Sequence, residues 1–382
     1  MSTNFQNFFQ ELQKRGIIAN YANLDNFYHL EPANLDNFYH LEPEERVVYL
    51  GVDCTSESLH IGHLFLYFQA IRFAKEEFTV LLILGGATSK IGDPSDKDKE
   101  RPLLVEKDIE DYQNKIKSQL EKILIEPKKI EEVSFSPLEQ FYSNNPKLLS
   151  SIHQVLKINE IEKGKQWEKY LQYIWPENLF CSSKKPPFQI LNNQSWLEKI
   201  NFIDFLRQTG KYLTIAYLSN KETTKKRIET GLSFLEFSYP LIQAYDFCYL
   251  YKNYNCHGQL GGSDQWGNLT TGLKLIRSIY PQNKTFAFNF PLLTDKEGKK
   301  YSKSEKGSNV LRLDSNQKEF CDFWRNLPDE QAKIYALQFT FLREEQINKL
   351  LELNNPPRLR ILQRILYELI HFLSFGKVGK IV

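Results

Sequence analysis

The sequence predicts a doubly wound α/β domain followed by a small α-helical domain, and three observations support this fold class. A compact apolar run over 47–53 is typical of a buried parallel strand. An apolar helical stretch over 59–75 and a second apolar run over 79–85 follow it, which gives the order strand, helix, strand. After residue 309 the chain turns helical and mixed in charge, as expected of a separate helical domain.

The N-terminus is expected to form a short amphipathic helix that ends at Gly16. Its apolar residues stand at helical spacing: Phe5, Phe8, Phe9 and Leu12. The segment carries an acidic residue and has no apolar centre, so we do not expect a secretory signal. It is also poor in Arg and Ser for an organellar transit peptide.

An exact repeat follows this helix. Residues 22–32 read ANLDNFYHLEP, and residues 33–43 repeat them letter for letter. Two copies are too few for a solenoid. We interpret the repeat as a local duplication in a surface loop, because added loop length costs little closure entropy. The alternative is a contact surface of Phe and Tyr side chains.

A second irregular stretch spans about 137–187. It mixes Asn, Lys and Ser with aromatic residues and shows no steady period, so we expect an insertion that decorates the catalytic domain. The expected domains are therefore 1–290, α/β and of Rossmann type; 291–308, a mobile loop; and 309–382, a helical domain.

The C-terminal part contains two helix signals. Phe320, Phe323, Trp324 and Leu327 form one amphipathic face. Pro356 and Pro357 then precede a helix from Arg358, a favourable place for proline. Arg358, Arg360 and Arg364 make this helix locally positive, and two readings stay open: a solvated face or phosphate contact.

Composition limits the classes of function. The 382 residues are 41% hydrophobic and carry a net charge of +2, so any nucleic-acid surface must be local. The chain has five cysteines without metal-ligand spacing, which favours a reduced, cytoplasmic protein: Cys54, Cys181, Cys248, Cys256 and Cys321. No apolar run is long enough to span a bilayer, so we expect no membrane association.

The first chemistry-bearing signature is His60-Ile61-Gly62-His63, at the start of the first helix after a strand. Free N–H groups and the helix dipole favour an anion there. His60 and His63 share one face and can donate hydrogen bonds to phosphate oxygens as charge builds on them. Gly62 allows close approach, and Thr55 adds a hydroxyl donor. The alternative is two surface histidines.

The second signature is Lys300-Tyr301-Ser302-Lys303-Ser304, between Gly298 and Gly307. Lys300 and Lys303 supply mobile charges suited to a departing pyrophosphate, and such loops close over a reaction. The alternative is a solvated basic turn.

Two motifs lie between the signatures. Gly261-Gly262-Ser263-Asp264 places a close backbone beside a carboxylate, which suits a ribose. Tyr239, Gln243 and Asp246 fall on one helix face within an apolar stretch. Buried polar groups need partners, so we expect either a bound polar ligand or, as the alternative, an internal hydrogen-bond network.

Together these residues resemble the class I aminoacyl-tRNA synthetases and, among them, the bacterial-type tyrosyl-tRNA synthetases. The resemblance reaches from the N-terminus to about Gly376 and rests on 49–53, 55, 59–63, 85–88, 91–95, 239–246, 262–267 and 300–304. It implies activation of L-tyrosine with ATP to tyrosyl-adenylate and pyrophosphate, and transfer of tyrosine to tRNA(Tyr). It also implies a homodimer, and it implies that the helical domain 309–382 resembles an anticodon-binding domain.

The resemblance implies a role for each site residue. Tyr49 and Asp246 would bind the phenol hydroxyl, an arrangement that rejects phenylalanine by roughly 10⁴–10⁵. Asp93, Tyr239 and Gln243 would hold the ammonium group, and Gln265 would orient the substrate near its carboxylate. ATP would meet Gly51, Asp53, His60, His63, Gly262, Asp264, Lys300 and Lys303. The transition state would be stabilised by Thr55, His60, His63, Lys300 and Lys303, with Lys97 and Arg101 as further pyrophosphate contacts. Mg²⁺ would arrive with ATP, without a dedicated protein site.

The chain departs from the family outline in three ways: the repeat, the insertion, and its end at Val382. The usual bacterial form continues into an S4-type RNA-binding module, which we expect to be absent. Two alternatives therefore remain: a truncated relative that forms the adenylate but charges tRNA poorly, and a non-charging RNA-binding relative. A tryptophan-specific relative is disfavoured, because indole has no hydroxyl for Tyr49 and Asp246.

Overall fold

The computed structural model describes residues 2–23, 38, 40–95, 104–125, 142–157, 172–175, 187–228, 231–294, 310–353 and 360–375. The chain divides into two compact units. Unit 1 comprises Met1–Glu57, Arg72–Lys117 and Pro186–Leu292. Unit 2 comprises Ser58–Ile71, Ser118–Lys185 and Leu293–Val382.

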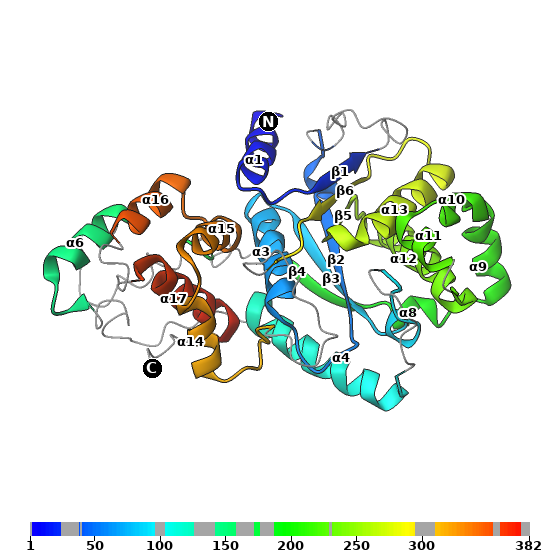
Figure 1. The fold of residues 1–382 in the computed structure, drawn as a ribbon. Coiled ribbons are helices and arrows are strands. Elements are labelled where there is room, and N and C mark those ends of the chain that lie inside the picture. The colour runs from blue at the N-terminus through cyan, green and yellow to red at the C-terminus, as the bar shows by residue number, and fades with distance from the viewer. Residues whose placement is uncertain are drawn as a thin grey trace. The chain divides into compact units, whose positions relative to one another are not determined.

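Unit 1 is built on a six-stranded sheet of order β1-β6-β5-β2-β3-β4 (Figure 1). All neighbouring strands run parallel except β1, which is antiparallel to β6. The strands are β1 (Asn20–Asn23), β2 (Val47–Asp53), β3 (Thr79–Gly85), β4 (Phe188–Asn192), β5 (Gly258–Gly262) and β6 (Phe286–Phe290). The predicted strands 47–53 and 79–85 are confirmed, and the fold class is the mostly parallel, Rossmann-like α/β arrangement that the sequence predicted.

Helices cover both faces of this sheet. Tyr49, Gln259 and Ala287 are register partners in neighbouring strands, so they point to the same face. Tyr49 and Ala287 pack there with Phe247 of α12 (Phe234–Tyr254) and with α13 (Trp266–Ile279). On the other face, the Phe288 ring lies 5.9 Å from Phe9 of α1 (Ser2–Lys14) and 5.9 Å from Phe73 of α3 (Ile61–Lys75).

The predicted N-terminal helix is confirmed as α1, which buries the four predicted apolar residues. The backbone turns left-handed at Gly16, where φ is +64°, a conformation that glycine adopts without strain. The other helical elements that lie in unit 1, wholly or in part, are η2 (Pro43–Glu45), η3 (Thr88–Lys90), α4 (Glu106–Leu120), α8 (Gln194–Leu197), α9 (Phe202–Gln208), η6 (Gly210–Tyr212), α10 (Ile215–Ser219), α11 (Glu222–Ile228) and η7 (Ser263–Gln265).

Unit 2 is helical in its C-terminal part, as predicted. These helices are α14 (Gln317–Arg325), α15 (Asp329–Phe339), α16 (Glu344–Glu352) and α17 (Ile361–Phe375). Aromatic side chains fill the space between them: the Trp324 ring lies 6.0 Å from Tyr335 and 5.7 Å from Phe339. The amphipathic face predicted around Phe320 is therefore a core face.

The prediction for Arg364 was wrong. We expected it either on a solvated face or in contact with phosphate, and it is neither. Its side chain is buried in α17, and this burial lowers the pKa of its guanidinium. Arg360 donates to the carbonyl oxygen of Leu327 at 2.8 Å. Arg358 lies outside the described residues.

The stretch 137–187 was predicted to be an insertion without a steady period. Part of it forms α6 (Pro146–Val155), and the short π-helix η4 (Glu121–Ile125) precedes it. The Asn145 side chain caps α6 and Pro146 occupies its first turn, which favours helix initiation. In unit 2 the Gln346 amide of α16 donates to the carbonyl oxygen of Val155 at 3.0 Å. The described part of this stretch thus packs with the C-terminal helices.

Within the described ranges, no helix combines the length and the apolar character that a membrane span requires.

Candidate active site

The site residues of unit 1 gather where parallel strands end. Tyr49, Gly51 and Asp53 alternate along β2 and so share one face of the sheet. Ligands of open α/β sheets bind at the carboxyl ends of the strands, next to such residues. The polar side chains that follow β3, β4 and β5 reach the same edge.

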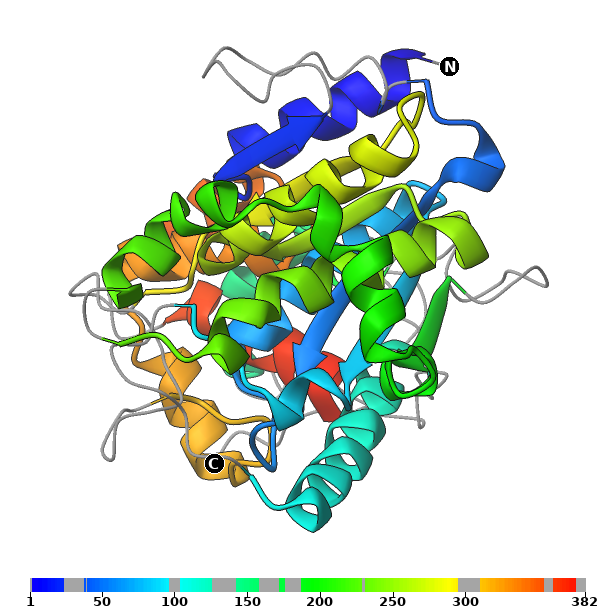
Figure 2. The ribbon, with the colours of Figure 1, turned by 90° about the vertical axis from the view of Figure 1, so that its right-hand side faces the viewer.

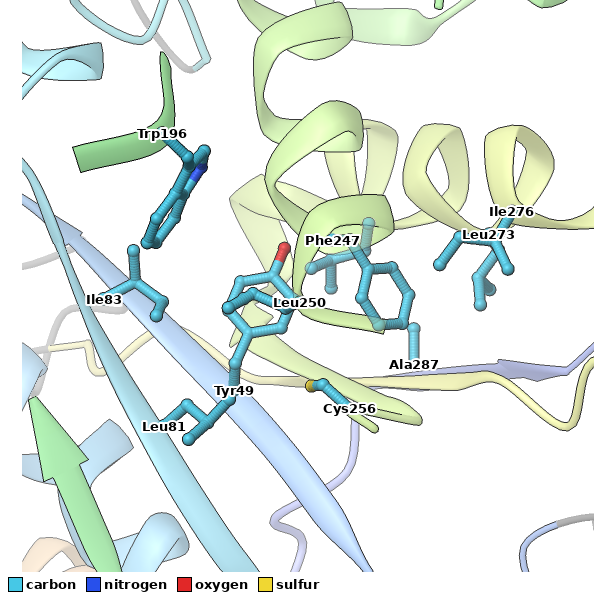
Figure 3. Packing of buried hydrophobic residues seen from close by; sticks show 11 residues of the cluster. Tyr49, Leu81, Ile83, Trp196, Phe247, Leu250, Cys256, Leu273, Ile276 and Ala287 are labelled. Carbon is cyan, nitrogen blue, oxygen red and sulfur yellow. The ribbon is translucent and has the colours of Figure 1, made fainter. Parts of the chain in front are cut away.

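Tyr49 has a buried hydroxyl without a partner. Its side chain is 3% exposed, and its ring lies 5.4 Å from that of Phe247. The hydroxyl makes no hydrogen bond within the described structure. Figure 3 shows this oxygen at the end of the ring remote from β2, on the side where Trp196 and Phe247 lie. Burial and the nearby Asp246 carboxylate raise the pKa of Tyr49 well above its usual value, so the phenol stays neutral.

Asp246, on α12, holds a buried carboxylate between two donors. Trp196 Nε1 donates to its Oδ1 at 2.7 Å and Asn193 Nδ2 to its Oδ2 at 3.0 Å. Burial raises the pKa of Asp246 to about 7, although both hydrogen bonds lower it. Trp196 is itself held by stacking on Tyr249, with ring centroids 4.7 Å apart.

Asp53 is the second carboxylate of the site. Thr88 Oγ1 donates to Asp53 Oδ1 at 2.7 Å, and the Tyr239 hydroxyl donates to Oδ2 at 2.9 Å. Thr88 Oγ1 also accepts from Asn193 Nδ2 at 3.2 Å. One hydrogen-bonded chain therefore links Tyr239, Asp53, Thr88, Asn193 and Asp246, and Asn193 connects the two carboxylates.

Asp93 is the third carboxylate. Its Oδ1 accepts from the Ser95 backbone at 2.9 Å, and its Oδ2 accepts from Gln265 Nε2 at 2.5 Å. Gln265 in turn accepts from Asn268 at 3.0 Å. Burial raises the pKa of Tyr239 well above its usual value, and Asp53, Asp93 and Asp246 all raise it further. The Tyr239 hydroxyl is thus bonded to Asp53 and lies within the electrostatic influence of Asp93 and Asp246.

The remaining predicted residues of unit 1 lie on the expected elements. Gln243 is half-buried one turn after Tyr239 on α12. A Cβ at Gly262 would lie 2.5 Å from Oδ1 of Asp264, so the carboxylate folds against the backbone at the end of β5. Gly51 is exposed, and Thr55 follows β2 in a half-buried turn.

In unit 2, His60 and His63 stand at the start of α3 with ring centroids 3.9 Å apart. The Gly62 backbone donates to Nδ1 of His60 at 3.1 Å, and the His60 backbone donates to Nδ1 of His63 at 3.2 Å. An accepting Nδ1 leaves the hydrogen of a neutral imidazole on Nε2. Both rings are therefore oriented as Nε2 donors. A side chain at Gly62 would crowd the His60 ring in this orientation, because a Cβ there would lie 2.9 Å from Cε1 of His60.

Lys300 and Lys303 lie outside the described residues, as do Lys97 and Arg101. In the part of the chain that is described, no three His, Cys, Asp or Glu side chains gather in a metal-binding group. The described cysteines, Cys54, Cys248, Cys256 and Cys321, form no disulfide bonds.

The sequence did not identify Thr88, Asn193 and Trp196 as site residues. A signal was present, because Asn193 directly follows β4 and Thr88 follows β3, at the edge where ligands bind. Strand β4 itself was not predicted, so the position of Asn193 could not be used.

The chain is similar in sequence to known proteins. Residues 42–378 match the family model described as tRNA synthetases class I (W and Y). A protein of Borrelia duttonii named tyrosine–tRNA ligase is 35% identical over 342 residues, 89% of this chain and 67% of that protein. One of the same name from Mycoplasma capricolum is 33% identical over 94% of this chain and 70% of its own length. The chain thus spans about two thirds of the length of these curated relatives.

Solved structures agree in fold. A C-terminally truncated mitochondrial tyrosyl-tRNA synthetase from Aspergillus nidulans matches with a TM-score of 0.70 and 25% identity, covering 98% of this chain and 93% of that one. The tyrosyl-tRNA synthetase from Archaeoglobus fulgidus, solved with L-tyrosine, matches with a TM-score of 0.56 over 97% of this chain and 98% of that one. At 12% identity, this second likeness concerns the fold alone.

Proposed function

The chain belongs to the class I tRNA synthetases for tryptophan and tyrosine, and we propose that the polar residues at the carboxyl ends of the strands in unit 1 form its tyrosine-binding site. Its activity is that of a tyrosine–tRNA ligase, as in the relatives from Borrelia and Mycoplasma. Its substrates are therefore tyrosine, ATP and tRNA(Tyr). We assign residues of this chain to the individual steps of that reaction.

The observation that carries the assignment is the unpartnered hydroxyl of Tyr49 beside the charge of Asp246. A substrate phenol would accept a hydrogen bond from Tyr49 and donate one to Asp246. Phenylalanine would leave the buried Tyr49 hydroxyl without a partner, which costs about 1–3 kcal/mol, and would offer Asp246 no donor besides Trp196 and Asn193. Indole has no hydroxyl for this pair.

The three carboxylates that act electrostatically on Tyr239 suit the ammonium group of an amino acid. We assign Asp93 and Tyr239 to this group, with Gln243 one turn further along α12. Gln265, held between Asp93 and Asn268, is assigned to the side of the substrate carboxylate. A cation at this place offsets the mutual repulsion of the three acids.

For ATP we assign the ribose to Gly262 and Asp264, and the adenosine side to Gly51 and Asp53. Phosphate oxygens are assigned to His60 and His63, because both rings are oriented as Nε2 donors. Thr55 adds a hydroxyl donor. Lys300 and Lys303 complete the set by their place in the sequence motif.

The reaction requires no nucleophilic side chain. The tyrosine carboxylate attacks the α-phosphorus of ATP, a new C–O–P bond forms, and the bond to pyrophosphate breaks. The enzyme contributes positioning and stabilisation of charge. Mg²⁺ would enter bound to the ATP phosphates, without a dedicated protein site.

We also propose that unit 1 forms a homodimer through the end that carries α9, α10, α11 and the start of α12. Figure 2 shows these green helices facing the viewer. This end exposes large apolar side chains: Phe202, Ile203, Leu206, Ile215, Ile228, Phe234 and Leu235. Phe234, at the first position of α12, is 72% exposed and is therefore a suitable position for testing this surface. Such an apolar surface is typical of an interface.

The dimer is tested by the mass of the protein in solution. Light scattering after size exclusion should give twice the chain mass for the unaltered protein and a monomer for Phe234→Asp. Ile334→Asp, at an exposed apolar position of unit 2, should leave the mass unchanged. A monomeric unaltered protein would refute the proposal.

We also propose a cytoplasmic location. The four described cysteines, which form no disulfide bonds, agree with a reducing compartment.

The assignment of the site is tested by amino-acid-dependent ATP–pyrophosphate exchange, with phenylalanine and tryptophan as controls. We expect exchange with tyrosine alone. Charging of tRNA(Tyr) by the same sample separates a complete ligase from a chain that stops at the adenylate. Exchange that proceeds equally with phenylalanine would refute the roles given to Tyr49 and Asp246.

A further inference from the structure

The backbone on either side of His60 is bonded to a segment that is remote in sequence. Ile61 N donates to the carbonyl oxygen of Leu311 at 2.9 Å, and the carbonyl oxygen of Leu59 accepts from Leu313 N at 2.9 Å. The two hydrogen bonds form an antiparallel bridge centred on His60. All of these residues belong to unit 2, and the four that form the bonds are buried. The residue that carries this imidazole is therefore fixed from both sides.

Gln119 holds the turn that leads into His60. Its Oε1 accepts from Leu59 N at 2.8 Å, and its Nε2 donates to the Ser58 hydroxyl at 2.9 Å. Ser58 and Leu59 are both buried, and buried polar groups of this kind need a partner within the protein. Gln119 lies in the last turn of α4, so a helix sets the position of the amide that supplies these partners.

The bridging segment is held in shape by a bidentate ion pair. Arg312 donates from Nε and from Nη2 to the two carboxylate oxygens of Asp314, both at 2.8 Å. These hydrogen bonds lower the pKa of Asp314, and a hydrogen bond with Ser58 adds to the effect. Gln119, Ser58 and Asp314 thus form one hydrogen-bonded chain from α4 to the bridging segment.

The orientation of the His60 ring depends on this backbone. Gly62 N donates to Nδ1 of His60 at 3.1 Å, so the ring and the start of α3 move together. Without the Gln119 amide, the buried N–H of Leu59 would lose its acceptor, and the turn would shift to find another. That shift would displace Nε2 of His60, the atom that we assigned to a phosphate oxygen.

We propose that Gln119 is a positioning residue for adenylate formation, which acts by fixing the turn before His60. The inference rests on the role proposed for His60. Misplacement of a catalytic group by about 1 Å can cost on the order of 10²-fold in rate, so the loss of one amide should be measurable. Because Tyr49 and Asp246 belong to unit 1 and Gln119 to unit 2, the loss should appear in kcat and not in KM for tyrosine.

Steady-state ATP–pyrophosphate exchange on the full chain tests this role. Gln119→Met keeps the length of the side chain but has no amide, so kcat should fall about tenfold or more while KM for tyrosine stays within about twofold. Ser118→Ala, at an exposed neighbouring position of α4, is the matched control and should leave both constants unchanged. Urea denaturation establishes that each variant is folded under the assay conditions.

A background without the imidazole separates positioning from a general loss of structure. In His60→Ala, the further change Gln119→Met should lower kcat by less than about twofold, because both changes act on one group. If Gln119→Met does not fold, Ser58→Ala removes the acceptor for Nε2 and should show the same dependence on His60.

Three results would count against these roles, and they are distinguishable. A folded Gln119→Met protein with unaltered kcat would overturn the proposal. So would an equal fall of kcat in the unaltered and His60→Ala backgrounds. A fully active His60→Ala protein would instead refute the role given to His60, and the positioning role of Gln119 with it.

Discussion

Trp196 Nε1 donates a 2.7 Å hydrogen bond to Oδ1 of Asp246, and both groups are buried. The bond joins the short helix after β4 to the middle of α12. It fixes one oxygen of the carboxylate, while Asn193 fixes the other. A ligand hydroxyl therefore meets a carboxylate that is already oriented, and little reorganisation is needed when the ligand binds.

Tyr49→Phe should stabilise the free protein and weaken tyrosine binding at once. The change removes a buried hydroxyl that has no partner, so the free energy of unfolding without ligand should rise by about 1 kcal/mol. The same change removes a donor to the substrate phenol, so kcat/KM for tyrosine should fall by about tenfold. Urea denaturation and pyrophosphate exchange measure the two effects. A variant that is less stable without ligand would contradict the account.

Asp246 should make tyrosine binding depend on pH near neutrality. A phenol donor favours the carboxylate form, and the pKa of Asp246 is about 7 in the free protein. Tyrosine affinity should therefore fall as the pH drops below 7, and binding at pH 6.5 should release protons. Calorimetry in two buffers of different ionisation enthalpy detects this release. In Asp246→Asn, which binds more weakly, the proton release should disappear.

The same shift affects stability without ligand. The pKa of Asp246 is raised from 3.8 to about 7 on folding, chiefly by burial. Its contribution to stability is therefore fully present below about pH 4 and is lost as the pH rises through about 7. Asp246→Asn should gain stability relative to the unaltered protein as the pH rises from 5 to 8. Chemical denaturation over that range follows this difference, and parallel curves for the two proteins would disprove it.

Asn193→Leu should disturb both carboxylates, because Asn193 donates to Asp246 and to Thr88. Loss of the donor should raise the apparent pKa in tyrosine binding above that of the unaltered protein and raise KM for tyrosine by about tenfold. A role in folding alone would leave the pH profile unmoved. Ser195→Ala, at an exposed neighbouring position, serves as the control.

Gly62→Ala should slow adenylate formation without weakening tyrosine binding. A Cβ at this position would lie 2.9 Å from Cε1 of His60, so the ring must move from its present orientation. Misplacement of a catalytic group by about 1 Å can cost on the order of 10²-fold in rate. Gly210→Ala is the control, because a Cβ there meets its nearest atom at 3.5 Å. Equal rates for Gly62→Ala and the unaltered protein would argue against the role of His60.

Local pattern was sufficient for part of the fold. The sequence determined β2 and β3 to the residue, the N-terminal helix α1, and the helix face that carries Tyr239 and Asp246. Apolar spacing along a short stretch reports directly on the strand or helix that it forms. The motifs likewise determined which family the chain belongs to, because they depend on residue type and order.

Only the tertiary structure decided which side chains meet. Asn193 lies 53 residues before Asp246 in the chain, and their hydrogen bond exists because β4 joins the sheet beside β3. The burial of Arg364 and the 5.1 Å contact of the Phe38 ring with Phe286 depend in the same way on elements that are remote in sequence. Strand order and register set these contacts, and neither leaves a local signal, because hydrogen bonds across a sheet pair residues whose separation along the chain is arbitrary.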